Sequence, residues 1–290
     1  MQPWQNLGFT APDRLVDLAR AAEEAGMHGV SLPEHLVTPT TIDTPNPYVA
    51  GGGSGYSPDT PFIDPFVAFG ALSAVTTTLQ FLANVYVLPL RHLFVAAKAI
   101  SSAAVLSKDR IVLGVGIGWL REEFEAAGAR FGDRGARTDE MLGLLRELLT
   151  GAPVASDSLH HRFREVRLAP VPAQPVPVLV GGISDAALRR AAHADGWIGV
   201  NFSEQTLLPI LDRLRAAREV AEREQSALDR PFAIVVSRPP EFDRALAQRY
   251  ARAGVTAMVN RPTTFSVGAL ASRSEHLDAM REFVDVLTHL

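Results

Sequence analysis

Short apolar runs alternate with amphipathic stretches along the whole chain of 290 residues. Residues 79–88 and 111–116 are rich in Val, Leu and Phe, as expected for strands that are buried on both faces. Between such runs the apolar residues repeat at helical spacing, for example over residues 12–25, where Pro12 suits a first helical turn. Regular alternation of strand and helix predicts a parallel sheet covered by helices, which is the α/β class.

The number of repeats narrows the architecture further. Eight strands are predicted, at residues 7–10, 29–32, 79–88, 111–116, 178–180, 197–200, 232–237 and 256–260. Helices are predicted after them, at residues 12–25, 62–75, 93–106, 120–127, 137–149, 185–194, 204–223, 240–252 and 275–288. Eight such units favour a closed (β/α)8 TIM barrel with insertions, and such a barrel commonly takes about 250 residues. We therefore expect one domain over residues 1–290.

Composition excludes several classes of protein. The chain has no cysteine, which rules out disulfides, cysteine–zinc sites and thiol nucleophiles. The formal net charge is −4 and no basic block is present, so a nucleic acid is not expected as a partner. No run of about 18 apolar residues is available to span a membrane. The first residues lack the basic and apolar regions of a signal peptide, so we expect a cytoplasmic protein.

Three interruptions fall in the alternation, at residues 34–61, 151–177 and 261–273. The first and last follow predicted strands, which places them at the carboxyl-terminal rim where barrel enzymes keep their active sites. The stretch 169–177 is rich in proline and cannot form a helix. We interpret it as an extended brace that leads into the fifth strand.

Polar residues at two strand ends are candidates for chemistry. Glu34 and His35 follow the second strand, and a histidine on the rim can exchange a proton with a substrate oxygen near neutral pH. The alternative is a histidine that only hydrogen-bonds its own loop. Asn84, beside Val85, breaks the apolar pattern of the third strand and needs a partner, either a side chain or a ligand. Arg91 could bind an anion or pair with a carboxylate at the surface.

Two glycine turns offer close approach to a ligand. Gly116 and Gly118 lie in the segment GVGIGW after the fourth strand, followed by Trp119, which is either a stacking wall or core. The turn after the fifth strand, Gly181–Gly182–Ile183–Ser184, leads straight into a helix. Its bare N–H groups, helix N-terminus and serine hydroxyl form the best anion site in the sequence, although an ordinary serine cap would look the same.

A metal centre is not expected. His160 and His161 are adjacent, so on a regular helix or strand their side chains point apart, and no carboxylate pattern accompanies them. No nucleophile elbow and no zinc-protease motif is present.

The order of these motifs resembles a known family. The residues are PEHL (33–36), LPLRH (88–92), RIVLGVGIGWLREEFEAAG (110–128) and VLVGGISDAALRRAAHADGW (178–197). Together they are similar to the bacterial luciferase-like monooxygenase superfamily, and more narrowly to its branch that uses coenzyme F420, an 8-hydroxy-5-deazaflavin. The resemblance covers roughly residues 7–225 and weakens after residue 230. Family members often have Thr-Gly or Thr-Ser where this chain has Ala83-Asn84.

The resemblance implies roles for the candidate residues. His35, with Glu34, would lie beside the deazaflavin as acid or base. By position, a non-proline cis peptide bond that supports the ring would join Asn84 and Val85. The turn over residues 116–119 would approach the ring or its side chain, and Gly181, Gly182, Ile183 and Ser184 would hold the cofactor phosphate.

Three functions are consistent with these residues. The leading hypothesis is F420-dependent hydride transfer that reduces an activated C=C, C=N or C=O bond of a small organic molecule or oxidises an alcohol. The second is a monooxygenase that uses reduced FMN and oxygen, and only that function would need a partner flavin reductase. The third is a barrel that binds a cofactor without catalysis. The apolar helix at residues 93–106, with the helix at 62–75, suggests a subunit contact and hence a homodimer.

Overall fold

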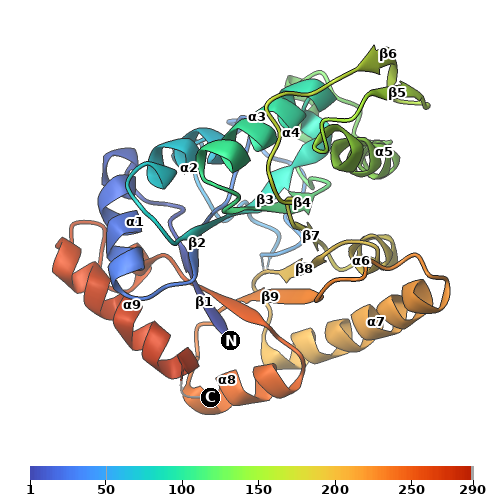
Figure 1. Ribbon diagram of the computed structural model, residues 1–290. Coiled ribbons are helices and arrows are strands. Elements are labelled where there is room, and N and C mark those ends of the chain that lie inside the picture. Colours follow the sequence, from blue (N-terminus) through green and yellow to red (C-terminus); the bar gives the residue numbers. More distant parts are fainter. Residues whose placement is uncertain (50, 289–290) are drawn as a thin grey trace.

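The structure is a computed structural model that describes residues 1–49 and 51–288. Its centre is a closed barrel of eight parallel strands in the order β1, β10, β9, β8, β7, β4, β3, β2 (Figure 1). The helices form an outer layer around the barrel. The (β/α)8 TIM barrel predicted from the alternation of strand and helix is therefore confirmed.

The elements lie close to their predicted positions. The barrel strands are β1 (Gln2–Asn6), β2 (Gly29–Leu32), β3 (Gln80–Val87), β4 (Ile111–Gly116), β7 (Val178–Gly181), β8 (Gly196–Gly199), β9 (Ala233–Ser237) and β10 (Ala257–Asn260). The α-helices are α1 (Leu15–Glu24), α2 (Pro65–Ser73), α3 (Leu93–Leu106), α4 (Arg121–Ala126), α5 (Arg134–Leu148), α6 (Asp185–Ala192), α7 (Glu204–Arg223), α8 (Arg244–Arg252) and α9 (Arg273–Thr288). Short 3₁₀ turns occupy Pro12–Arg14, Leu88–Leu90 and Thr263–Phe265.

The first strand was predicted in the wrong place. Residues 7–10 form the turn after the strand, and β1 is the more polar run before them. Trp4 fills the barrel interior, while Gln5 is buried on the other face of the strand. Its amide is satisfied there, because Gln5 Nε2 donates to the Arg261 carbonyl at 3.0 Å and Gln5 Oε1 accepts from Asn260 at 2.9 Å. A strand whose polar residues are paired in this way shows no apolar run in the sequence.

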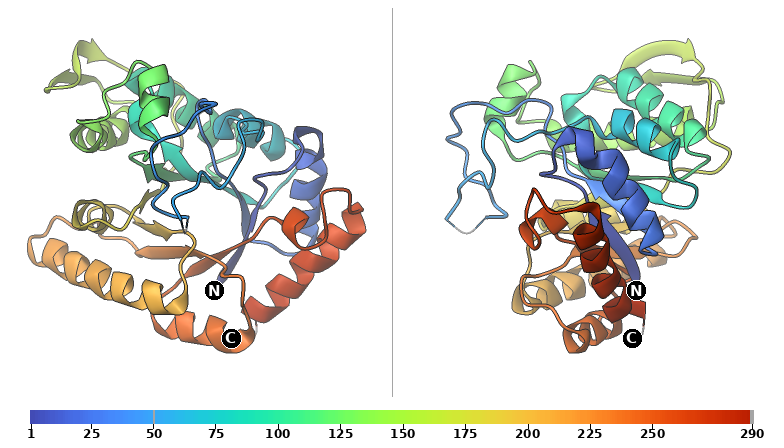
Figure 2. Two further views of the ribbon diagram at one scale, coloured as in Figure 1. Left: turned by 180° about the vertical axis from the view of Figure 1, so that it is seen from behind. Right: turned by 90° about the vertical axis from the view of Figure 1, so that its left-hand side faces the viewer.

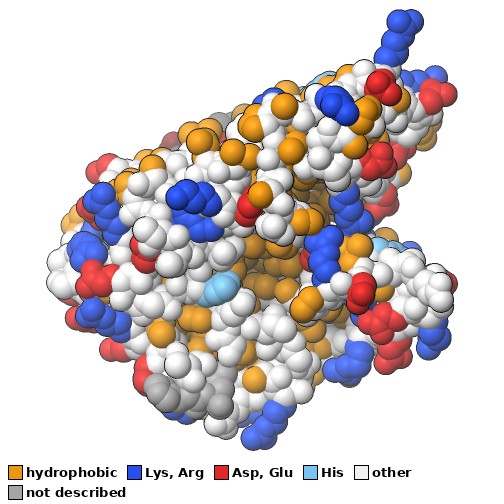
Figure 3. Space-filling view, viewed as in Figure 1, with side chains coloured by type: hydrophobic (Ala, Val, Ile, Leu, Met, Phe, Trp, Pro, Cys, Tyr) orange, Lys and Arg blue, Asp and Glu red, His pale blue; other side chains and the backbone are white. Residues whose placement is uncertain are grey.

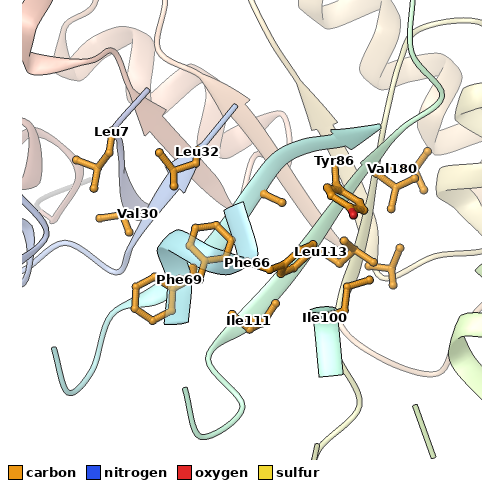
Figure 4. Close-up of a cluster of buried hydrophobic side chains, with 14 of the residues drawn as sticks. Leu7, Val30, Leu32, Phe66, Phe69, Tyr86, Ile100, Ile111, Leu113 and Val180 are labelled. Carbon is orange, nitrogen blue, oxygen red and sulfur yellow. The ribbon is translucent and has the colours of Figure 1, made fainter. Parts of the chain in front are cut away.

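Two apolar layers hold the barrel together. One fills its interior and consists of Trp4, Leu82, Leu179, Ile198, Val235, Ala257 and Val259. The other lies between the strands and the surrounding helices. Figure 4 shows part of this outer layer, where Phe66 and Phe69 of α2 pack against Tyr86 and Phe81 of β3, and Ile100 of α3 lies beside Ile111 and Leu113 of β4.

The interruption at residues 151–177 contains structure that the sequence did not predict. Strands β5 (Val154–Asp157) and β6 (Arg162–Val166) pair as an antiparallel hairpin that projects from the barrel (Figure 1). The proline-rich stretch that follows has no helix and runs directly into β7, as expected for a brace. At its end, the Pro177 carbonyl accepts from the Leu113 N–H at 2.8 Å.

The interruption after β2 covers the barrel mouth. This segment, between β2 and α2, crosses in front of the carboxyl ends of the strands in the left view of Figure 2. Glu122 of α4 accepts the N–H groups of Asp43 and Thr44, each at 2.8 Å, and the Asn201 side chain donates to the Tyr48 carbonyl at 3.4 Å. The segment is thus tied to the rim on two sides.

Candidate active site

A pocket of about 570 Å³ opens at the carboxyl ends of the barrel strands, beneath the segment that follows β2. All eleven residues that the sequence analysis proposed for the site line it, and they are Glu34, His35, Asn84, Val85, Gly116, Gly118, Trp119, Gly181, Gly182, Ile183 and Ser184. The barrel thus brings together residues that lie up to 150 positions apart, since parallel strands end on the same rim.

His35 is held by a carboxylate that the sequence analysis missed. Its Nδ1 lies 3.0 Å from Glu123 Oε2, and the other oxygen of Glu123 accepts the Leu36 N–H at 2.5 Å. The Glu123 side chain is only 1% exposed. A carboxylate accepts hydrogen bonds, so Nδ1 carries the proton toward Glu123. No described residue hydrogen-bonds to His35 Nε2, which is therefore available to a ligand.

Glu34 has a different environment from the one proposed. Its carboxylate accepts the Val87 N–H at 2.8 Å and pairs with Arg91 at 2.6 Å, and the Glu34 side chain is 1% exposed. Burial raises the pKa of Glu34, against the opposing effects of Arg91 and the Val87 N–H. Both oxygens are therefore used to hold the end of β3. Arg91 is itself buried, so it pairs with a carboxylate inside the protein and not at the surface.

The floor of the pocket is the irregular end of β3. The peptide bond between Asn84 and Val85 is cis, as predicted, and the pairing of β3 with β4 shifts at this point. The Val85 side chain packs so closely against Gly116 that a Cβ there would lie 2.6 Å from Val85 Cγ2. Asn84 Oδ1 is buried and has no hydrogen-bond partner among the described residues. This oxygen is an acceptor in the pocket wall that a ligand donor can satisfy.

The two glycine turns follow the neighbouring strands β4 and β7 and shape adjacent parts of the wall. Gly118 has a φ of +79°, and a Cβ on it would meet the ring of Phe124 at 2.6 Å. After β7, Gly182 has a φ of +109°, and its carbonyl accepts from Trp197 Nε1 at 2.8 Å. Ser184 caps α6 by accepting the Ala187 N–H at 3.2 Å. The first-turn N–H groups of α6 have no partner within the helix, so this end of the pocket suits an anion.

Aromatic rings enclose His35. Its ring centroid lies 4.8 Å from that of Tyr56, 5.0 Å from Phe62 and 6.3 Å from Trp119. All three rings line the pocket, so Trp119 is a wall residue. Tyr56 and Phe62 were not singled out from the sequence. Two of the four tyrosines of the chain, Tyr48 and Tyr56, lie in the segment after β2, but the contact of Tyr56 and Phe62 with His35 depends on how this segment folds back.

The adjacent histidines lie outside this pocket. His161 Nδ1 is 3.2 Å from Glu140 Oε2, and the same oxygen accepts the His160 N–H at 3.0 Å. The sequence showed no carboxylate pattern beside them, and the packing of the hairpin against α5 brings Glu140 of that helix next to both. Across residues 1–49 and 51–288, no group of three or more His, Asp or Glu side chains is arranged to hold a metal ion.

The fold is a barrel with a pocket at its carboxyl-terminal mouth, and comparison with known proteins gives its family. Residues 2–283 match the family model described as luciferase-like monooxygenase, so the chain belongs to the luciferase-like monooxygenase family. No helix in the described part of the chain is both long and apolar enough to cross a membrane.

Individual relatives give further context. The chain is 36% identical over 244 residues to the uncharacterized protein Rv0940c of Mycobacterium tuberculosis, covering 84% of this chain and 83% of that one. It is 32% identical over 257 residues to an F420-dependent glucose-6-phosphate dehydrogenase of Gordonia bronchialis, covering 83% and 70%.

Solved structures share the fold. Monooxygenase RslO1 of Streptomyces bottropensis superposes with a TM-score of 0.75 at 20% identity, covering 99% of this chain and 98% of that one. An F420-dependent secondary alcohol dehydrogenase in complex with an F420–acetone adduct has the same TM-score at 14% identity and the same coverage. At these identities the likeness concerns the barrel alone.

Proposed function

We propose that the protein is an F420-dependent oxidoreductase that moves a hydride between the deazaflavin and a small organic substrate. The observation that carries this proposal is the His35–Glu123 pair, which presents a free imidazole nitrogen to the same pocket that Asn84 and the Gly181–Ser184 turn line. A hydride carrier and a proton carrier that share one pocket are what alcohol oxidation or carbonyl reduction requires.

The residues present fit a deazaflavin with a phosphate-bearing side chain. The irregular end of β3 offers a ring the unpaired Oδ1 of Asn84 and the apolar side chain of Val85. The N-terminus of α6 and the Ser184 hydroxyl would hold the phosphate. When bound, the deazaflavin accepts or supplies a hydride with two electrons, and the matching proton must be handled by the protein.

His35 is suited to that proton. Because Glu123 accepts the proton on Nδ1, the Nε2 lone pair is directed away from the carboxylate. Nε2 takes the hydroxyl proton when an alcohol is oxidised and returns it when a carbonyl is reduced. The surrounding rings limit the access of water to this nitrogen. Glu34 takes no part in this exchange, since both its oxygens are bound.

The choice of F420 over FMN is supported by relatives. Two proteins that are 32% and 30% identical to this chain are F420-dependent glucose-6-phosphate dehydrogenases. The test is to titrate the purified protein with F420 and with FMN by fluorescence and calorimetry. We expect F420 to bind at micromolar concentration or below and FMN to bind much more weakly. Binding of FMN alone would overturn the choice in favour of an oxygen-using flavoenzyme.

A matched pair of serine variants tests the phosphate site. Ser184 caps α6 and lines the pocket, whereas Ser203 caps α7 in the same manner and does not line it. We expect Ser184→Ala to weaken F420 binding about tenfold, the loss expected for one or two hydrogen bonds to a charged group. Ser203→Ala should bind F420 as the parent does. Equal affinity for both variants would remove Ser184 from the site.

We also propose that two copies associate through α2 and α3. Val67 of α2 is 70% exposed, and Val95 and Leu106 of α3 are 63% and 68% exposed. Figure 3 shows hydrophobic side chains gathered over these two helices. We expect light scattering to give the mass of a dimer, and Val95→Glu to give a monomer, because a buried unpaired carboxylate opposes association. A parent protein that is monomeric at high micromolar concentration would contradict this.

A further inference from the structure

The part of the pocket around His35 also carries information about the substrate. Tyr56 and Phe62 pack against His35 and against each other, with 5.1 Å between their ring centroids. Phe9 continues this wall at 6.0 Å from Phe62, and Trp119 adds a further ring. We call Phe9, Tyr56, Phe62 and Trp119 the aromatic box. Its surface offers large apolar contact area and few polar groups to whatever lies beside His35.

Charged side chains in the pocket are already committed to the protein. Of the described lining residues, only Glu34, Glu123 and Arg134 carry a carboxylate or a Lys or Arg charge. Both glutamates accept hydrogen bonds from backbone N–H groups and from a basic side chain. Arg134 donates to the Gly118 and Phe131 carbonyls at 3.1 and 2.8 Å, and its guanidinium lies 3.7 Å from the Phe131 ring centroid. Arg134 is therefore the single Lys or Arg among the described lining residues, and it stands against two buried glutamates.

This balance of charge disfavours anions in the box. A phosphate or carboxylate placed there would lose its hydration against aromatic rings that supply no counter-charge, and it would face the two buried glutamates. The helix end that suits an anion belongs to β7 and α6, and two strands, β3 and β4, separate β7 from β2 around the barrel. An uncharged substrate neither loses the hydration of a charge nor is repelled by the buried glutamates.

Tyr56 adds a specific polar contact. Its hydroxyl is buried and has no hydrogen-bond partner among the described residues. Burial raises the pKa of Tyr56, and the Glu123 carboxylate raises it further, so the phenol stays protonated and can donate near neutral pH. His35 Nε2 also has no hydrogen-bond partner among the described residues. One substrate oxygen that accepts from the phenol and contacts Nε2 would satisfy both.

We propose that the substrate is an uncharged alcohol, or the matching ketone, with an aromatic or alicyclic body that lies in the aromatic box and an oxygen held by Tyr56 and His35. This rests on the proposed function for the hydride step. It separates this protein from its relative named for glucose 6-phosphate, since that sugar carries a dianionic phosphate for which the box has no counter-charge.

The test compares ligands that differ in charge. 1-Phenylethanol and mandelate share a phenyl ring and a secondary hydroxyl, but mandelate has a carboxylate in place of the methyl group. Calorimetry and ligand-observed NMR would measure their binding, with glucose 6-phosphate as a second anion, in the presence and absence of F420. We expect 1-phenylethanol to bind at least about tenfold more tightly than either anion, a difference of about 1.4 kcal/mol. An anion that binds equally or more tightly overturns the proposal.

Two tyrosine variants locate the contact. Tyr56→Phe removes only the hydroxyl, and we expect 1-phenylethanol binding to weaken about fivefold, the loss of one hydrogen bond. Tyr250→Phe is the control, because Tyr250 also has a buried hydroxyl without a described partner but lies on α8 outside the pocket. It should leave binding unchanged. Equal binding by both variants would show that Tyr56 does not hold the substrate oxygen.

The same measurements separate the two proposals. If the preference for 1-phenylethanol holds in the protein without F420, and F420 itself does not bind, the cofactor assignment fails while the substrate class stands. If F420 binds and mandelate is preferred, the substrate class fails while the cofactor assignment stands.

Discussion

Two buried glutamates on the rim of the barrel have nearly identical exposure and opposite consequences. Glu34 and Glu123 each have a side chain that is 1% exposed, and each binds a basic side chain and a backbone N–H. Glu34 binds Arg91, a permanent cation whose other hydrogen bond is to the Val87 carbonyl of the protein itself. Glu123 binds His35, whose second nitrogen remains free. The comparison indicates that the partner of a buried carboxylate decides whether the pair is closed within the protein or leaves an atom available to a ligand.

The largest effect is expected from breaking the Glu34 pair. Arg91→Ala leaves a buried carboxylate without its cation, and we expect the free energy of unfolding to fall by about 3–5 kcal/mol. Replacing both partners, as Glu34→Gln with Arg91→Met, should cost less than Arg91→Ala alone. Urea unfolding measures both. Arg215→Ala, which breaks an exposed pair with Asp212, is the control and should change stability by less than about 1 kcal/mol.

Replacing Glu123 by glutamine should lower the rate of turnover more than it lowers the free energy of unfolding. In Glu123→Gln the amide nitrogen donates to His35 Nδ1, which moves the imidazole proton to Nε2, the atom that has to accept the substrate proton. We expect turnover of an alcohol with F420 to fall about 10²- to 10⁴-fold, with little change in F420 affinity.

The imidazole itself provides an independent measurement. Nitrogen NMR of His35 should show the tautomer changing in Glu123→Gln and not in Glu125→Gln, an exposed neighbour on the same helix. Unchanged turnover in Glu123→Gln would make His35 a structural residue and would revive the hypothesis of a cofactor-binding barrel without catalysis. His35→Ala would then leave every rate unchanged as well.

A smaller effect is expected at Glu122, which holds the segment over the mouth. Burial acts to raise the pKa of Glu122, but hydrogen bonds from its own N–H and from Thr44 and Asp43 outweigh burial and lower this pKa to about 2, from an ordinary value of 4.5. A lowered pKa means that the folded state favours the carboxylate. The resulting stability is fully present above pH 4.5 and is lost as the pH falls toward 2.

The pH dependence gives the measurement. We expect Glu122→Gln to lower the free energy of unfolding by about 1 kcal/mol at pH 7. The difference from the parent should shrink below pH 4.5 and vanish near pH 2. A difference that is constant from pH 7 to pH 2 would show that the carboxylate charge is not responsible.

The sequence predicted the barrel because hydrophobic periodicity is a local property that each strand and helix carries by itself. It also predicted the positions of His35, Asn84 and the two glycine turns, since residues at the ends of parallel strands must share a rim. The sequence did not predict which carboxylate contacts His35. Glu34 was assigned to the chemistry because it is adjacent to His35, whereas the true partner, Glu123, lies 88 residues away in the sequence.

Such long-range contacts depend on how a short helix docks against a loop, and no periodic pattern records that. The same reason explains why Tyr56 and Phe62 were missed: they lie in or beside an irregular segment of the chain. The first strand failed for a different reason, because its polar face is satisfied inside the protein by residues from the other end of the chain.

Helix α4 is six residues long, and the two consecutive glutamates near its start bind two different parts of the pocket. Glu122 holds the segment over the mouth and Glu123 holds the imidazole. A displacement of this short helix would loosen the segment over the mouth and would also reorient the His35 imidazole. We therefore expect an entrance segment transplanted from a relative to be held over the mouth only if its backbone N–H groups meet Glu122 as those of Asp43 and Thr44 do.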